Sequence, residues 1–160
     1  MKNQESPGPG DIPRYELTES RERYGVVAGI TGSTLIQSDD PLHPLDPPHP
    51  LPFDLGLWSD QPVGQVMTRW RQFRDTLAFP DAVLGHQCHG TEVAWHPSAP
   101  APLRPSASAL TLLDRIDGHA TGSLGTLLLV TVADCIPVYL LEPRKRILAL
   151  LHSGWRGTAG

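Results

Sequence analysis

Two short apolar runs near the end of the chain constrain its fold more than any other stretch. The runs Ile136–Leu141 and Ile147–Leu151 are separated by a polar, proline-containing tetrad, Glu142–Lys145. This pattern predicts an antiparallel hairpin. If the first and last residues of the tetrad face each other, Cys135 lies opposite His152, with Cβ atoms about 4.5–5.5 Å apart. The hairpin is therefore expected to bring a thiol and an imidazole together, as in a metal site or a Cys–His nucleophile pair.

Length, charge and cysteine content exclude several classes of protein. A chain of 160 residues predicts one domain, and 39% hydrophobic with 19% charged residues indicates a globular one. A net charge of -4 without a basic run argues against nucleic-acid or membrane-surface partners. No apolar stretch is long enough for a transmembrane helix, and the N-terminus lacks a secretory signal pattern. With only Cys88 and Cys135, no disulfide framework is implied, and a cytoplasmic location is expected.

The clearest helix signal covers Val63–Leu77. Its apolar residues recur at steps of three and four, and its charged residues lie elsewhere. Asp60 and Pro62 suit the beginning of a helix, and Pro80 follows its end. The apolar stripe is interpreted as core rather than as part of a cofactor site. It comprises Val63, Val66, Met67, Trp70, Phe73 and Leu77.

Proline-rich segments divide the rest of the chain. The polar residues 1–14 are expected to be disordered, and Ser38–Phe53 to form an extended surface loop, because its repeated prolines exclude helix and central strand. His43 and His49 in that loop are interpreted as solvated side chains, and Pro97–Ser108 as a linker. Short strands are expected at Tyr24–Ile30, Glu92–Trp95 and Thr126–Val132.

Both strands of the expected hairpin are apolar on both faces, so they need covering layers above and below. The fold class expected is α/β (α+β), with layered sheets. The helix Val63–Leu77 hardly supplies both layers, and Gly157–Ala159 resembles the start of another helix just before the last residue. The chain is therefore expected to be incomplete at its C-terminus. Its uncovered sheet is expected to associate with a second copy or a complementing C-terminal chain.

A second set of metal-ligating residues precedes the hairpin, in His86-Gln87-Cys88-His89. Combining His86 or His89 with Cys135 and His152 gives three ligands and an open fourth position, the arrangement of a catalytic zinc site. Spacing alone leaves the choice between the two histidines open. The alternative is that the histidines are satisfied surface residues and that Cys135 is an inert core residue.

The segment Ser153–Gly157 adds candidates for substrate binding. Arg156 lies between glycines, where a guanidinium can hold an anion such as phosphate, and Trp155 can stack on an aromatic ligand. Asp134 and Asp117 are the nearest carboxylates in the sequence, and either can orient a ligand histidine or act as a base. Glu92 is a weaker candidate of the same kind.

Four blocks of residues together resemble one family. They are Gln87–Gly90, Asp117–Gly118, Thr131–Val138 and His152–Gly157. In order and approximate spacing they resemble the YfiH-like, or laccase-domain, proteins, first described as multicopper polyphenol oxidases. That family is now regarded as zinc-dependent purine nucleoside phosphorylases with adenosine deaminase activity. The resemblance covers about residues 22–160, as the N-terminal part of such a domain, and leaves residues 1–21 as a disordered N-terminal segment.

The resemblance implies a layered α/β fold around mixed sheets flanked by helices. It also implies zinc bound by His89, Cys135 and His152, which selects His89 over His86. Cys135, His152, Asp134 and Arg156 are then the expected catalytic residues. The implied substrates are adenosine, inosine and methylthioadenosine. Either phosphate attacks the ribose, or a metal-activated water attacks the purine carbon that bears the amino group.

The chain departs from this family in three respects. Gly29–Thr34 has no arginine where the family carries T-R-x-G-G, so a substrate or phosphate contact near Thr31–Ser33 is missing. The loop Ser38–Phe53 is altered, and family members continue for about another hundred residues. Three alternatives therefore remain. They are a copper-dependent polyphenol oxidase, for which the chain has few histidine ligands, a Cys135/His152 hydrolase, and a catalytically inactive truncated remnant.

Overall fold

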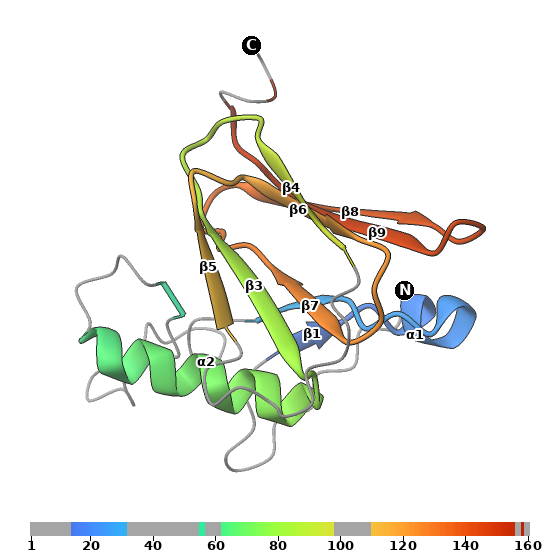
Figure 1. Cartoon of the computed structure of the whole chain (residues 1–160), viewed down its shortest axis with the longest axis horizontal. Coiled ribbons are helices and arrows are strands. Elements are labelled where there is room, and N and C mark those ends of the chain that lie inside the picture. Colours follow the sequence, from blue (N-terminus) through green and yellow to red (C-terminus); the bar gives the residue numbers. More distant parts are fainter. Residues whose placement is uncertain (1–13, 32–54, 57–61, 98–109, 156–157, 159–160) are drawn as a thin grey trace, which may run out of the picture. The chain divides into compact units, whose positions relative to one another are not determined.

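A computed structural model describes residues 14–31, 55–56, 62–97, 110–155 and 158. The chain divides into two compact units, Met1–Arg69 and Trp70–Gly160. The described residues form two helices and three sheets (Figure 1). The helices are α1 (Thr18–Tyr24) and α2 (Val63–Leu77). The strands are β1 (Arg14–Glu16), β2 (Gly29–Thr31), β3 (Asp81–His86), β4 (Val93–His96), β5 (Leu110–Asp114), β6 (Gly118–Thr121), β7 (Thr126–Leu129), β8 (Ile136–Glu142) and β9 (Ile147–Ser153).

In the first unit, β1 and β2 form an antiparallel pair with α1 between them in sequence. The expected strand Tyr24–Ile30 is wrong in its first part, because Tyr24 ends α1. Gly25 follows in the left-handed conformation with φ 67°, and its N–H donates to Arg21, which is a common way to end a helix. Residues 14–21 thus contain β1 and part of α1, two elements that the composition did not predict.

The helix α2 has the bounds that the sequence predicts, Val63–Leu77. It begins with the Pro62 carbonyl accepting hydrogen bonds from the N–H groups of Gln65 and Val66. The buried part of its apolar stripe is formed by Val66, Trp70 and Phe73, whereas Val63 at the first turn is exposed. The interpretation of this stripe as core is therefore confirmed for its middle turns.

The second unit contains a parallel sheet of three strands in the order β5-β3-β7. The middle strand β3 is buried along most of its length, through Ala82, Val83 and Leu84. Since the three strands are parallel, their carboxyl ends lie at one edge of the sheet. The loops that follow them therefore start from the same place.

The second unit also contains a mixed sheet in the order β4-β6-β9-β8, in which β8 and β9 form the expected hairpin (Figure 1). The expected register is wrong by two residues. Glu142 pairs with Ile147, so that His152 lies opposite Pro137 and Cys135 precedes the strand. The turn is longer than assumed because the Glu142 carboxylate accepts the Arg144 N–H at 2.9 Å and Arg146 adopts a left-handed φ of 56°.

Strand β8 is apolar on both faces, as expected, but the described residues leave much of it uncovered. Ile136 and Leu140, on one face, are 65% and 51% exposed, and Tyr139 on the other face is exposed too. β8 is an edge strand, which accounts for part of this exposure. Strand β4 is shifted by one residue from its expected position, and β7 ends at Leu129 instead of Val132.

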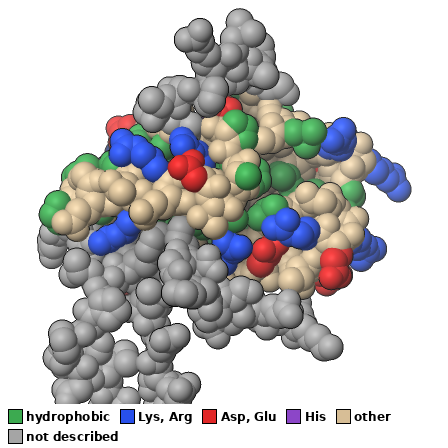
Figure 2. Space-filling view, turned by 90° about the horizontal axis from the view of Figure 1, so that it is seen from below, with side chains coloured by type: hydrophobic (Ala, Val, Ile, Leu, Met, Phe, Trp, Pro, Cys, Tyr) green, Lys and Arg blue, Asp and Glu red, His purple; other side chains and the backbone are tan. Residues whose placement is uncertain are grey.

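Several expectations from the sequence lie wholly or mostly outside the described residues: the disorder of residues 1–14, the proline-rich loop with His43 and His49, the linker before Leu110, and the helix start at Gly157–Ala159. Within the described part of the chain, no helix has the length and apolar character to cross a membrane. On the face shown in Figure 2, Lys and Arg side chains lie beside Asp and Glu side chains and apolar ones.

Candidate metal centre

Three loops at the carboxyl edge of the parallel sheet carry the candidate residues. His89 follows β3, Asp117 follows β5, and Cys135 follows β7. The fourth residue, His152, comes from β9 of the mixed sheet. Ligand sites in open α/β sheets commonly lie beyond the carboxyl ends of parallel strands. The topology therefore brings residues 63 positions apart in the sequence to one place.

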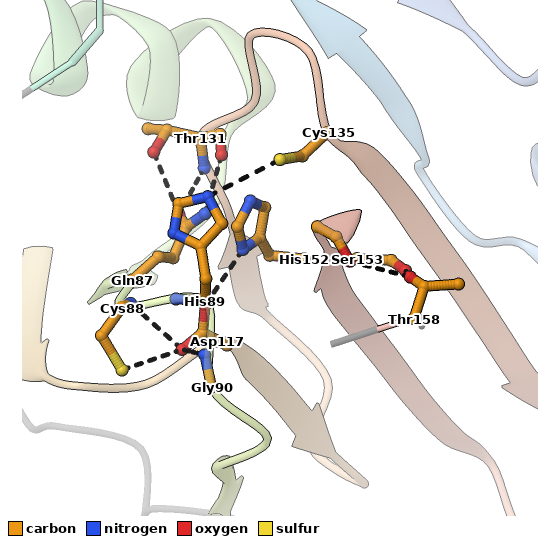
Figure 3. Close-up of polar contacts among 11 residues, drawn as sticks. Gln87, Cys88, His89, Gly90, Asp117, Thr131, Cys135, His152, Ser153 and Thr158 are labelled. Carbon is orange, nitrogen blue, oxygen red and sulfur yellow. Dashed lines mark hydrogen bonds and ion pairs between the residues drawn. The ribbon is translucent and has the colours of Figure 1, made fainter. Parts of the chain in front are cut away.

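The side chains of His89, Cys135 and His152 converge (Figure 3). One ligand atom from each lies within 4.8 Å of the other two. The Cys135 Sγ is 3.8 Å from His89 Nε2, and the two imidazole rings meet edge to face with centroids 4.8 Å apart. His152 is buried, Cys135 is half-buried and His89 is exposed, so the cluster opens to solvent on the His89 side.

A small contraction of this cluster, whose donor atoms lie within 4.8 Å of one another, would give it the spacing of a tetrahedral metal site. Zinc–sulfur and zinc–nitrogen bonds of about 2.3 and 2.0–2.1 Å separate tetrahedral donor atoms by roughly 3.3–3.6 Å. The separation between the Cys135 and His89 donors is close to that range. Two imidazoles and a thiol suit zinc, and they also suit copper. Three protein ligands leave one position for water or substrate, as in catalytic zinc sites.

Gly154 makes the close approach of these donors feasible. A Cβ atom at this position would lie 2.7 Å from His89 Cδ2 and 3.4 Å from Cys135 Sγ. The first distance is shorter than real Cβ contacts allow, so any other residue would displace the imidazole. The backbone of Gly154 therefore forms one wall of the centre.

Asp117 organises the loop that carries His89. Its carboxylate accepts hydrogen bonds from the backbone N–H groups of Cys88, His89 and Gly90 at 3.1, 2.8 and 2.9 Å, and from the Cys88 thiol at 3.3 Å (Figure 3). His89 itself has a φ of 59°, which is uncommon for a residue other than glycine. The three N–H groups directed at one carboxylate hold the loop in that conformation.

The same carboxylate orients His152. Gly118 pairs with Leu151 across β6 and β9, so that Asp117 lies beside His152. The His152 N–H donates to the Asp117 carbonyl at 2.7 Å, and Nδ1 of its ring lies 3.0 Å from Asp117 Oδ1. If Nδ1 carries the proton, the lone pair of Nε2 is available to a metal.

The electrostatics of Asp117 follow from these contacts. Burial by itself would raise the pKa of the Asp117 carboxyl. Hydrogen bonds from the Gly90 N–H, from His152 and from Cys88 outweigh burial and hold this pKa well below its usual range. Asp117 is therefore a buried carboxylate at neutral pH, and its charge favours a cation at the neighbouring ligands.

Among the described residues, the other candidates from the sequence are not members of this group of ligands. His86 is exposed, and its Nδ1 lies 3.0 Å from Asp114 Oδ1. Glu92 contributes its backbone carbonyl, which accepts the N–H groups of Asp117 and Gly118. Asp134 is exposed. Trp155 is 74% exposed, and Arg156 lies outside the described residues.

A histidine pair that sequence reasoning missed joins β4 to β6. His96 Nε2 lies 3.0 Å from His119 Nδ1, and His119 is fully buried. Burial and the nearby charge of His96 lower the pKa of His119 to about 4, and burial lowers the pKa of His96. No sequence signal marks this pair, because the two residues are 23 positions apart and neither belongs to a recognisable motif.

Comparison with a protein-family model supports the resemblance. Residues 49–160 match the model of the family described as multi-copper polyphenol oxidoreductase laccase. The chain is 30% identical over 138 residues to purine nucleoside phosphorylase YlmD of Geobacillus stearothermophilus, covering 85% of this chain and 47% of that protein. It is 28% identical over 149 residues to purine nucleoside phosphorylase YlmD of Staphylococcus aureus, covering 91% and 53%.

Solved structures share the fold. The crystal structure of YlmD from Geobacillus stearothermophilus matches with a TM-score of 0.71 and 25% identity, covering 99% of this chain and 55% of that one. The crystal structure of the Bacillus licheniformis hypothetical protein YfiH matches with a TM-score of 0.66 and 27% identity, covering 91% and 51%. The expected α/β fold class is thereby confirmed. The chain spans about half the length of the curated relatives it matches.

Proposed function

Because the chain belongs to the multi-copper polyphenol oxidoreductase laccase family, we propose that it is a zinc-dependent purine nucleoside phosphorylase, or the N-terminal part of one. Two relatives named purine nucleoside phosphorylase support the phosphorylase part of the proposal. The observation that carries it is the convergence of the His89, Cys135 and His152 donor atoms within 4.8 Å. Such a donor set with an open position suits a catalytic metal more than a structural one.

In this proposal His89, Cys135 and His152 hold the zinc ion. Bound zinc supplies Lewis acidity beside the substrate. Asp117 keeps the His152 Nδ1 proton in place and fixes the backbone of His89, because its carboxylate contacts both residues. Its negative charge, together with that of a Cys135 thiolate, balances the charge of the ion.

The proposed reaction is phosphorolysis. A phosphate oxygen attacks C1′ of the ribose and the bond from C1′ to the purine nitrogen breaks. The purine nitrogen takes up the proton that the phosphate gives up, so the products are ribose 1-phosphate and the free purine. We assign phosphate binding to Arg156, because a guanidinium presents paired donors to an oxyanion. Asp134, exposed and next to Cys135, is the proposed base. Deamination of adenosine by water, releasing ammonia and inosine, is a second proposed activity of the same centre.

The test combines metal analysis with nucleoside assays on the 160-residue chain. We expect one zinc per chain and phosphate-dependent release of base from adenosine, inosine or methylthioadenosine. His89→Ala should abolish both, whereas His86→Ala, which removes an exposed histidine outside the cluster, should retain both. Absence of phosphate-dependent base release from all three nucleosides would contradict the proposal. Equal losses of zinc and of base release in His89→Ala and His86→Ala would contradict the assignment of His89 as a metal ligand.

A second candidate function is copper-dependent oxidation of phenols, which the family's description names. Two imidazoles and a thiolate can also bind copper, but this function ranks below the zinc enzyme, because a multicopper oxidase needs more histidine ligands than one such group supplies. Copper in the purified protein, together with oxygen uptake in the presence of a phenol, would support this function. Zinc in the same analysis, without phenol oxidation, would exclude it.

A cytoplasmic location is part of the proposal. Cys88 and Cys135 are both free thiols. A thiol that serves as a metal ligand must stay reduced, and the cytoplasm keeps thiols reduced. Fractionation of cells that express the protein would test the location directly, and recovery of the protein with a periplasmic or secreted marker would contradict it.

A further inference from the structure

The side chain of Gln87 forms hydrogen bonds with both backbone groups of Thr131. Its Nε2 donates to the Thr131 carbonyl at 2.8 Å. Its Oε1 accepts the Thr131 N–H at 2.7 Å and the Thr131 hydroxyl at 3.0 Å (Figure 3). The carboxamide thus satisfies both backbone groups of one residue that lies 44 positions away in the sequence.

These hydrogen bonds connect the two chain segments just beyond the end of the pairing between β3 and β7. The last paired residues of β3 and β7 are Leu84 and Leu129. Beyond them the chain of β7 is no longer paired with β3, and Gln87 reaches across to it. Gln87 stands two residues before His89, and Thr131 stands four residues before Cys135. The Gln87 side chain therefore ties the loop of one candidate ligand to the loop of another.

The two histidines of the centre depend on a different residue. Asp117 contacts the His89 N–H and the His152 ring, which fixes both imidazoles. The contact that Figure 3 draws for Cys135 is the one with His89 Nε2 at 3.8 Å, and no bond from Asp117 to Cys135 is drawn. Cys135 stands four residues after Thr131, in the loop whose start Gln87 holds by these hydrogen bonds.

We propose that Gln87 is the positioning residue for the sulfur ligand of the metal centre. By fixing Thr131 it holds the Cys135 loop near His89, and it thereby determines whether the centre offers two nitrogens and a sulfur or two nitrogens alone. Thiolate ligands favour zinc and copper(I) over harder cations. Gln87 consequently sets metal preference as well as affinity. This inference rests on the metal centre of the proposed function.

The test replaces Gln87 in the full 160-residue chain and uses cobalt(II) as a spectroscopic substitute for zinc. Gln87→Glu keeps the shape and one acceptor but places a carboxylate oxygen against the Thr131 carbonyl. Gln87→Met keeps the volume and removes every hydrogen bond. Gln72→Glu, on the exposed side of α2, introduces the same charge elsewhere and is the control.

We expect both Gln87 variants to bind zinc about 10–100-fold more weakly, the range for outer partners of metal ligands. In the cobalt complex the sulfur-to-cobalt charge-transfer band should fall more than the ligand-field bands, because the histidines remain. The Gln72→Glu control should match the wild type in both respects. A purely structural defect would weaken all bands together. Unchanged zinc affinity and charge-transfer intensity in both variants would overturn the proposal.

A measurement without metal separates this inference from the proposed function. In a Cys88→Ser background, the rate at which iodoacetamide alkylates Cys135 reports the freedom of its loop. In metal-free protein we expect Gln87→Glu and Gln87→Met to raise this rate several-fold, and Gln72→Glu to leave it unchanged. If the wild type binds no metal, the proposed function fails by itself. If the alkylation rate does not change, the positioning role of Gln87 fails.

Discussion

The two sheets of the second unit place apolar strands in opposite surroundings. Strand β3 of the parallel sheet is buried, with Leu84 at 0% exposure, whereas β8 of the mixed sheet, a more apolar strand, has Leu140 51% exposed. β3 lies between two strands and β8 lies at an edge. An apolar run thus predicts that a strand forms, but its neighbours decide how much of it is buried. The candidate centre lies where the two sheets meet.

The largest effect should follow from removing the residue that links the sheets. Asp117→Ala leaves the N–H groups of Cys88, His89 and Gly90 without their acceptor and His152 without its partner. Each buried donor left without its acceptor costs about 1–3 kcal/mol, so the free energy of unfolding should fall by about 4 kcal/mol. Urea denaturation measures it. Asp114→Ala, which removes an exposed carboxylate, is the control, and an equal loss there would contradict this role of Asp117.

The contrast in burial makes a direct prediction for one substitution in each sheet. Leu84→Ala should lower the free energy of unfolding by about 3 kcal/mol, because it leaves a cavity in the fully buried strand β3. Leu140→Ala in β8 should cost less than about 1 kcal/mol, because half of its side chain is already in water. Denaturant unfolding of the two variants compares them. Similar losses would mean that β8 is covered in solution.

The histidine pair of the mixed sheet should make the protein sensitive to acid. His119 has a pKa of about 4 in the folded chain, and about 6.5 is usual for an unfolded one. Between these values the unfolded state binds more protons, so the contribution of His119 to stability is constant above about pH 6.5 and falls as the pH drops toward 4. The loss from His119 amounts to about 3 kcal/mol.

Urea denaturation at several pH values measures this dependence. His119→Gln should flatten the decline between pH 6.5 and 4, even if it lowers stability at every pH. His86→Gln is the control, because His86 is exposed, and it should keep the decline of the wild type. A wild-type protein whose stability does not change over this range would contradict the burial of His119.

The smallest expected effect tests the wall of the centre. In Gly154→Ala the new Cβ would lie 2.7 Å from His89 Cδ2, so the imidazole must move. We expect zinc affinity to fall about tenfold and the free energy of unfolding to fall by about 1 kcal/mol. In Gly122→Ala the nearest atom to the new Cβ is 3.7 Å away, which is ordinary contact. This control should keep wild-type affinity. Isothermal titration with zinc measures both, and equal affinities would contradict the role of Gly154.

Parts of the site were predictable from the sequence because their signals are local. The bounds of α2 follow from its apolar period, and the existence of the β8–β9 hairpin follows from two apolar runs around a turn. Asp117 was among the candidates for orienting a histidine. Gln87 and Gly154 were present in the motifs, but no role followed from them, because their roles consist of contacts with Thr131 and His89.

The sequence by itself determined the types of side chain available and the segments that carry them. The tertiary structure decided which of them meet. The hairpin register that the sequence suggested placed Cys135 opposite His152, and the observed register places Pro137 there, because a side-chain bond of Glu142 and a left-handed Arg146 lengthen the turn. Cys135 approaches the histidines from a loop instead. The alternation of side chains in a strand repeats every two residues, so it does not indicate the length of a turn or the identity of partners distant in the sequence. Only the folded chain brings these donors together.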